Sequence, residues 1–285
     1  MSIELVKKYG TQVDELFFNE SKVDLVTNQD YDFTGAHSVK VYKISTAKMN
    51  DYKRDPSVLD PSVDGISCYG SVANLNATTE EMLLKKDRSF IFNIDRLDED
   101  ETGQILDAET ALARQIREVV VPEVDAYAYG VMATNAGTKA VAKELTRANI
   151  YDAILDGSEV LDDNKVPLTE RCIVVSTKVY KELKASGVFD TTPVSEEVKA
   201  HGVVAYIDGN AVIKMPSSDL PKDFGFMIAH PSATTLPIKL EDYNVNTDTP
   251  IVSGTIVTGR ICYDCFVLDN KAKGIYYQPI APEAA

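Results

Sequence analysis

The sequence contains no tryptophan, only three histidines and only four cysteines in 285 residues. The cysteines stand at positions 68, 172, 262 and 265, too few and too scattered for a disulfide scaffold. No apolar run approaches the roughly 18 residues that a membrane-spanning helix needs. The N-terminal segment has Glu4 and two lysines where a signal peptide would need an apolar stretch. These absences predict a soluble chain, made in the cytosol, with reduced thiols and no membrane contact.

Motifs of phosphate binding and nucleophilic catalysis are also missing. The sequence has neither G-x-x-x-x-G-K-[ST] nor G-x-G-x-x-G, so no phosphate-cradling loop is expected. The stretch Gly65–Gly70 reads G-x-S-x-x-G, one residue too long for a nucleophile elbow, and it does not lie between a strand and a helix. A polar loop is the better interpretation. We therefore expect no catalytic residue and no enzymatic activity.

Candidate metal ligands do not gather in the sequence. His37, His201 and His230 are far apart and follow no ligand spacing. Cys262 and Cys265 lie in a strand pattern, where positions i and i+3 point to opposite faces, so two small buried residues are expected instead of a zinc pair. The acidic cluster from Asp98 to Glu101 could hold a cation, although a solvated helix start explains it better. No metal or cofactor is expected.

The net charge of -15 argues against a protein whose main task is to grip nucleic acid, because phosphate contacts need clustered Lys and Arg. The same charge does not argue against a container for DNA, since a container wall need not bind its contents tightly and an acidic lining would keep the DNA mobile. Tyrosine is plentiful, with 14 residues, and suits large and partly wet contact surfaces.

The N-terminal third predicts an arm and a long β-excursion. Apolar residues spaced three or four apart predict a short amphipathic helix within residues 1–30, which should dock onto its own domain or a neighbour. Alternating runs at 39–44 and 90–94 predict two strands joined by a polar connection of roughly 40 residues, far longer than a hairpin loop. An isolated hairpin of this kind is marginal in water, so it implies a partner surface.

The longest helix is expected over residues 98–130. Asp98 and Glu101 resemble a capping box, and Ile105, Ala108, Leu112, Ile116 and Val119 would hold one face. Pro122 should kink or split this helix.

The remainder predicts a compact α/β unit followed by strands. Residues 136–229 show a helix at 147–162, a strand at 171–176, and a second helix capped by Thr177 that stops near Gly187. Asp208-Gly209 predicts a type I′ turn between two strands. Residues 251–268 alternate between an inner face with Val257, Ile261 and Tyr263 and an outer face with Thr258, Arg260 and Asp264. The last residues should be disordered.

Six pieces in order resemble one family, the major capsid proteins of tailed bacteriophages. They are YDFTGAHSVKVYKIST at 31–46, FNIDRLDEDET at 92–102, ARQIREVVVPEVDAY at 113–127, HGVVAYIDGNAVIKMPSS at 201–218, IAHPSATTLPIKLEDY at 228–243 and GRICYDCFVLDNKAKGIYY at 259–277. The resemblance covers nearly the whole chain. It implies an α+β chain of the Hong Kong 97 phage fold, with an N-terminal arm (1–30), an extended loop (31–94), a peripheral domain with a spine helix (95–135 and 230–285) and an axial domain (136–229).

The resemblance also implies a function and partners. Copies of the chain would form pentamers and hexamers of an icosahedral head, assembled in the bacterial host cytoplasm, that encloses double-stranded DNA without specific binding and becomes part of the virion. Some members carry a long scaffold domain ahead of the arm, and only residues 1–30 stand here. A separate scaffolding protein is therefore expected, unless the chain begins after processing, together with a portal and decoration proteins.

Particular residues can be assigned to assembly under this hypothesis. Contacts between subunits are expected at Lys40, Arg54, Arg96, Arg114, Arg117 and Glu118, although Arg114, Arg117 and Glu118 could equally form a solvated helix face with weak local ion pairs. Pro122 and the flanks of the long loop are the expected hinges. Lys48 and Lys53 lie in the loop, but no pattern identifies a partner for an isopeptide cross-link. The alternatives are an encapsulin-type compartment and, from another class, a soluble α/β enzyme.

Overall fold

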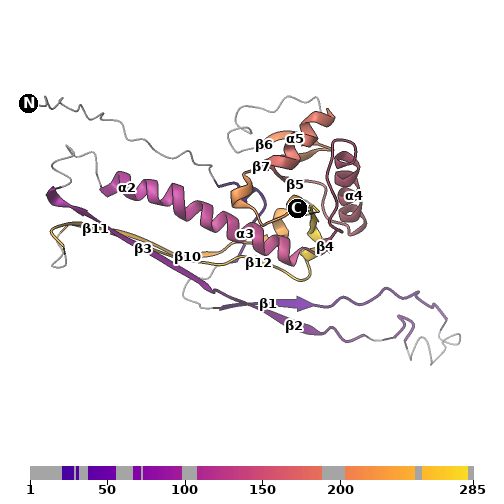
Figure 1. Ribbon diagram of the computed structural model, residues 1–285. Coiled ribbons are helices and arrows are strands. Elements are labelled where there is room, and N and C mark those ends of the chain that lie inside the picture. The colour runs from indigo at the N-terminus through magenta and orange to yellow at the C-terminus, as the bar shows by residue number, and fades with distance from the viewer. Residues whose placement is uncertain are drawn as a thin grey trace, which may run out of the picture. The chain divides into compact units, whose positions relative to one another are not determined.

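The computed structural model describes residues 21–28, 30–31, 38–55, 67–71, 73–97, 108–187, 203–247 and 252–281 (Figure 1). The chain divides into a smaller unit within Gly35–Leu83 and a larger unit that contains the remaining described residues. Within the described ranges, no helix is long and apolar enough to cross a membrane.

A six-stranded mixed sheet forms the centre of the larger unit, in the order β4-β13-β8-β5-β7-β6. Neighbouring strands are antiparallel, except that β5 runs parallel to β7 and β13 runs parallel to β4. The C-terminal strand therefore completes the sheet of the α/β segment that the sequence predicts over 136–229. The strands are β4 (Thr138–Lys139), β5 (Cys172–Ser176), β6 (Val203–Ile207), β7 (Asn210–Met215), β8 (Phe224–Ala229) and β13 (Ile275–Pro279).

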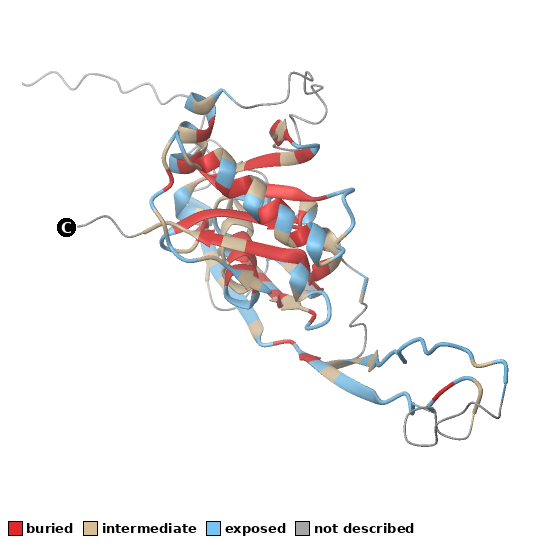
Figure 2. Ribbon diagram, turned by 90° about the vertical axis from the view of Figure 1, so that its right-hand side faces the viewer, coloured by how far each residue is buried: buried red, intermediate tan, exposed pale blue. Residues whose placement is uncertain are grey.

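Both faces of this sheet are covered, which explains why every residue of β5 is buried. Cys172 and Val174 belong to a core cluster shared with the long helix, whereas Ile173 and Val175 belong to a second cluster shared with helices α4 (Ile150–Asp163) and α5 (Thr177–Ser186). A strand buried on both faces reads as an uninterrupted apolar run, as CIVVS does here. In Figure 2 the strands are red beneath the helices of this layer.

The long helix is continuous over 108–135. It consists of α2 (Ala108–Gln115), a five-residue π-helical turn η3 (Ile116–Val120) and α3 (Val121–Asn135). Of the predicted kink or split at Pro122, the split is wrong, because the helix continues through the proline, which lies in the first turn of α3 after the π turn. The helix extends five residues beyond the predicted end at 130, and the expected cap at Asp98–Glu101 lies outside the described residues.

A three-stranded antiparallel sheet, in the order β10-β11-β3, runs along this helix (Figure 1). The strands are β3 (Lys86–Asp95), β10 (Ile238–Asn246) and β11 (Gly254–Tyr263). Gly259 of β11 lies between the rings of Phe90 and Tyr243, whose centroids are 6.1 Å apart. The glycine leaves room for aromatic rings that close over the strand from both sides.

Replacing this glycine should loosen the sheet. In Gly259→Ala the new Cβ would collide with Cζ of Phe90 and lie 2.9 Å from Cδ1 of Tyr243, so the Phe90 ring must move. We expect a loss of about 1–3 kcal/mol in the free energy of unfolding, measured with urea on the unassembled chain. Gly130→Ala on α3 is the matched control, because no atom lies within 4 Å of the position that its Cβ would take, and a helical Gly→Ala change should stabilise by up to about 1 kcal/mol.

The smaller unit contains a hairpin of β1 (Ser38–Ile44) and β2 (Ala77–Leu83), paired from Ser38↔Leu83 to Ile44↔Ala77. The predicted pairing of 39–44 with 90–94 is therefore wrong. Residues 90–94 lie in β3 and pair with β11 instead. The sequence ATTEEML of β2 is polar on both faces and gave no strand signal.

The predictions for the α/β segment are mostly confirmed. Gly187 ends α5 in the left-handed conformation with φ of 76°, and Asp208 and Gly209 have φ of 50° and 74°, as a type I′ turn requires. The predicted cap is displaced by one residue. Ser176, not Thr177, accepts the backbone N–H of Val179. The hydroxyl of Thr177 instead donates to the carbonyl of Met215.

Candidate assembly surfaces

The smaller unit exposes much apolar surface and has little core of its own. It contributes seven of the fourteen large hydrophobic side chains that are exposed in the described residues, whereas only Gly70 and Met82 of its described residues are buried. A two-stranded hairpin cannot bury such side chains by itself. This surface therefore suits contact with another chain. Its exposed members are Tyr42, Ile44, Met49, Tyr52, Tyr69, Leu75 and Leu83.

Two of the predicted assembly residues lie in this unit. Lys40 is exposed on β1 directly opposite Glu81 of β2, and Arg54 is exposed in the connection that follows β1. The neighbouring pair Lys43 and Glu80 forms an ion pair of 2.9 Å across the hairpin. The hydroxyl of Ser38 also donates to Glu81 at 2.9 Å, so both glutamates of β2 contact side chains of β1 across the hairpin.

The other four predicted residues lie in the larger unit. Arg96 is exposed just after β3, and its backbone N–H donates to the carbonyl of Ser253. Arg114 is half-buried at the end of α2, whereas Arg117 is exposed and Glu118 half-buried on the π turn. Next to them Val119 is 47% exposed, which the predicted apolar face did not anticipate.

The π turn explains how the helix passes Pro122 without a break. An interior proline lacks the N–H for an α-helical bond and its ring clashes with the carbonyl four residues earlier, which here belongs to Glu118. In the π turn the N–H of Val121 instead bonds to the carbonyl of Ile116, five residues back. The widened turn therefore ends at Val120, two positions before the proline.

A buried carboxylate fixes the start of β3, where the chain returns from the hairpin. Asp264, expected on the outer face, is 2% exposed. It accepts hydrogen bonds from the hydroxyl of Tyr127 at 2.7 Å, the backbone N–H of Lys85 at 2.9 Å and that of Cys265 at 2.8 Å. The ammonium of Lys86 lies 4.7 Å from the centre of the Tyr127 ring. A charged residue inside the apolar run ICYDCF was the sequence signal for this site.

The chain is also anchored to the larger unit before it enters the hairpin. Asn28 bonds through its backbone to Thr234 and Leu236, and its side-chain oxygen accepts the hydroxyl of Thr235. These partners lie in and beside β9 (Thr234–Thr235), which pairs with β12 (Phe266–Val267), two residues after Asp264. Both ends of the excursion are thus attached to one small patch of the larger unit.

Residues 21–28 form a strap that is built into the core. Val23 and Val26 are fully buried, and the thiol of Cys172 lies 3.4 Å from the carbonyl of Leu25. At its start, the hydroxyl of Ser21 donates to Asp125 of α3 at 2.8 Å. Burial raises the pKa of Asp125 to about 6, although the hydrogen bonds from Ser21 and the backbone of Lys22 lower it and the nearby Asp219 and Asp24 raise it.

Neutralising Asp125 should change how stability depends on pH. Because its pKa is raised in the folded chain, the folded state favours the protonated form, so this group's contribution declines as the pH rises from about 4 through 6. Relative to wild type, Asp125→Asn should gain up to about 3 kcal/mol between pH 4 and pH 7. Denaturant unfolding of both chains at the two pH values measures the difference. The exposed Asp152→Asn should show no such gain, and an equal gain in both variants would contradict the assignment.

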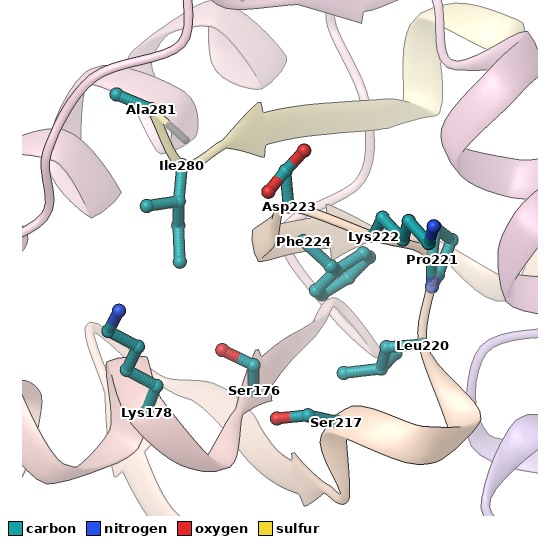
Figure 3. Close-up of a pocket in the computed structure, with 10 residues that line it drawn as sticks. All are labelled: Ser176, Lys178, Ser217, Leu220, Pro221, Lys222, Asp223, Phe224, Ile280 and Ala281. Atoms are coloured by element: carbon teal, nitrogen blue, oxygen red, sulfur yellow. The ribbon is translucent and has the colours of Figure 1, made fainter. Parts of the chain in front are cut away.

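A cavity of about 390 Å³ lies between the start of α5 and the chain after β13 (Figure 3). Its polar lining residues are Ser176, Ser217, Lys178, Lys222 and Asp223. The lining contains neither histidine nor cysteine.

The other polar groups that could carry chemistry have structural roles. His230 is 7% exposed, its ring nitrogen Nδ1 lies 2.8 Å from the hydroxyl of Ser232, and burial lowers its pKa. Cys262 is half-buried in β11, and burial raises the pKa of Cys265 to about 12, which favours an unreactive thiol. His37 and His201 lie outside the described residues. Among the described side chains, no three potential ligands gather as a metal site.

The sequence matches no protein-family model and no curated protein sequence. Solved structures nevertheless match almost end to end. A chain of Mycobacterium phage Che8 has a TM-score of 0.75 at 16% identity, with 98% of both chains covered. The capsid of cyanophage P-SCSP1u gives 0.71 at 14% identity, covering 98% of this chain and 93% of that one. The mature capsid of bacteriophage PhiM1 gives 0.66 at 17% identity, covering 98% and 92%.

This chain therefore has the α+β fold of phage capsid chains. The match includes the long helix over 108–135, and it covers almost the full length of this chain and of each of the three other chains.

Proposed function

We propose that this chain is the major capsid protein of a tailed bacteriophage, which assembles as pentamers and hexamers into an icosahedral head around double-stranded DNA. The observation that supports it most is the end-to-end likeness to phage capsid chains, with 98% of this chain covered. The apolar surface of the hairpin unit supports it independently, because that surface requires a neighbour. The role is structural and not enzymatic.

The parts of the chain take their roles within this proposal. Residues 1–30 are the arm, 31–94 the extended loop, 95–135 with 230–285 the peripheral domain, and 136–229 the axial domain of a Hong Kong 97-type subunit. Lys40, Arg54, Arg96, Arg114, Arg117 and Glu118 contact neighbouring copies, and Pro122 with its π turn is the hinge. A separate scaffolding protein, a portal and decoration proteins complete the particle, which assembles in the host cytoplasm.

Electron micrographs of the purified full-length chain test the proposal. We expect closed icosahedral shells, from the chain alone or after co-expression with a scaffolding protein. A chain that remains monomeric at high concentration under both conditions would contradict it. Nuclease-protected DNA in particles from infected cells separates a phage head from an encapsulin-type compartment, which would hold a cargo enzyme. The likeness to chains from phages does not favour the encapsulin alternative.

A further inference from the structure

Helix α4 carries a continuous acidic face. Four of its five exposed carboxylates follow a spacing of four, three and four residues, which places them in one line along the helix. These four are Asp152, Asp156, Glu159 and Asp163. The fifth, Asp162, forms an ion pair of 2.7 Å with Arg171. Lys143 approaches this face from outside the helix, with its Nζ 3.9 Å from Asp156. The helix itself contains no lysine or arginine.

Helix α5 carries the opposite charge on its exposed face. Lys178, Lys181 and Lys184 are exposed and spaced three residues apart, and Glu182 beside them is half-buried. The two helices cover the same face of the six-stranded sheet, with α4 against β13 and α5 against β5 and β7. They are the helices on the side shown in Figure 2. The acidic and basic faces therefore lie over opposite halves of one sheet.

Both charge patterns are unfavourable for the isolated subunit. Like charges four residues apart on a helix repel each other, as Asp152 and Asp156 do, and so do Glu159 and Asp163. The last turn of α4 is acidic and contains no basic residue, while the first turn of α5 contains Lys178 and no acidic residue. Each arrangement opposes the helix dipole, which favours cations at the C-terminus and anions at the N-terminus. A partner of complementary charge would offset both effects.

We propose that the acidic face of α4 in one copy binds the basic face of α5 in the next copy, and that this head-to-tail contact closes the rings of the shell. The proposal rests on the proposed self-assembly. A contact between two different faces of the same chain repeats around a rotation axis and closes into a ring, which an isologous contact cannot do beyond a dimer. Charge complementarity of this kind selects the correct partner and orientation.

Charge reversal tests the contact in the full-length chain. The acid-face reversal is Asp152→Lys, Asp156→Lys, Glu159→Lys and Asp163→Lys, and the base-face reversal is Lys178→Glu, Lys181→Glu and Lys184→Glu. Each alone should abolish particles in electron micrographs, because like charges then meet across the contact. The swap variant, with all seven changes, should assemble as wild type does. Lys271→Glu with Lys273→Glu, which reverses two lysines outside both helices, should also assemble.

A mixture of the two reversals gives the sharpest result. The acid-face reversal is basic on both helices and the base-face reversal is acidic on both, so they can contact only each other. An equimolar mixture should form strictly alternating rings, which have an even number of members. Native mass spectrometry should find hexamers with three copies of each variant and no pentamers.

Several outcomes would overturn the contact. It fails if either reversal assembles like wild type, or if the swap variant folds with wild-type thermal stability and still does not assemble. It also fails if only the base-face reversal prevents assembly, because the lysines then serve another anionic partner such as DNA. A wild-type chain that never forms particles contradicts the proposed function itself, whereas wild-type particles with assembling reversals contradict the contact alone.

Discussion

Removing the hairpin unit should abolish shells without unfolding the subunit. The change deletes Ser38–Leu83 and keeps residues 32–37 as a linker to Leu84. The larger unit should keep its free energy of unfolding within about 1 kcal/mol, because hardly any described residue of the hairpin unit is buried. The linker can close the gap, since six residues reach about 20 Å and both ends attach beside the paired strands β9 and β12.

The readouts for this deletion are thermal unfolding and electron microscopy. A full-length variant with Tyr42→Ser, Ile44→Ser and Met49→Ser should lose particles in the same way, because it keeps the backbone and removes exposed apolar surface. Lys48→Ala with Asp51→Ala changes exposed polar residues of the same segment and should assemble. Normal particles from the deletion would contradict the role assigned to the hairpin. Deleting 50–85 instead would also remove Lys85, and with it a hydrogen bond to Asp264.

Removing the buried carboxylate should have the largest effect of a single substitution on stability. Asp264→Ala leaves the Tyr127 hydroxyl and the N–H groups of Lys85 and Cys265 without their acceptor in a buried site. We expect a loss of about 4 kcal/mol in the free energy of unfolding, because each orphaned buried donor costs about 1–3 kcal/mol. Denaturant unfolding of the unassembled chain measures the loss, and hydrogen exchange at the Lys85 amide should accelerate.

Asp242→Ala is the matched control for this substitution. Asp242 is exposed on β10 and accepts one hydrogen bond, from the side chain of Asn244 at 2.7 Å. Its removal should change the free energy of unfolding by no more than about 0.5 kcal/mol. Equal effects of the two substitutions would show that the Asp264 cluster does not hold the start of β3 in place.

The sequence predicted correctly those features that depend only on residues next to each other in the chain. The helix stop at Gly187 and the turn at Asp208-Gly209 depend on left-handed backbone positions, and such positions have a strong residue preference. The pairing of β3 could not be derived in this way. Its partner β11 lies about 170 residues further along the chain, and period-2 alternation shows that a strand has two faces without showing which strand lies beside it.

The π turn could not be predicted from the sequence either, because its effect appears only in the spacing of buried residues along the long helix. Partly or fully buried residues on the long helix recur every four residues, from Leu112 through Ile116, Val120, Val124 and Ala128. In a continuous α-helix each step of four residues drifts by about 40°, so such a series would leave the core face. The extra residue in the π turn offsets part of this drift. The prediction placed Val119 on the apolar face, whereas Val120 occupies it.

Pro122 also limits the direction in which the π turn can move along the long helix. To travel one residue toward α3, the widened turn would need a hydrogen bond from the N–H of residue 122 to the carbonyl of residue 117, and proline has no such group. The turn can travel only toward α2, none of whose residues is buried, while α3 stays packed in the core. Pro122 therefore blocks movement of the π turn toward α3, and any shift of that turn is confined to the part of the long helix that precedes the proline.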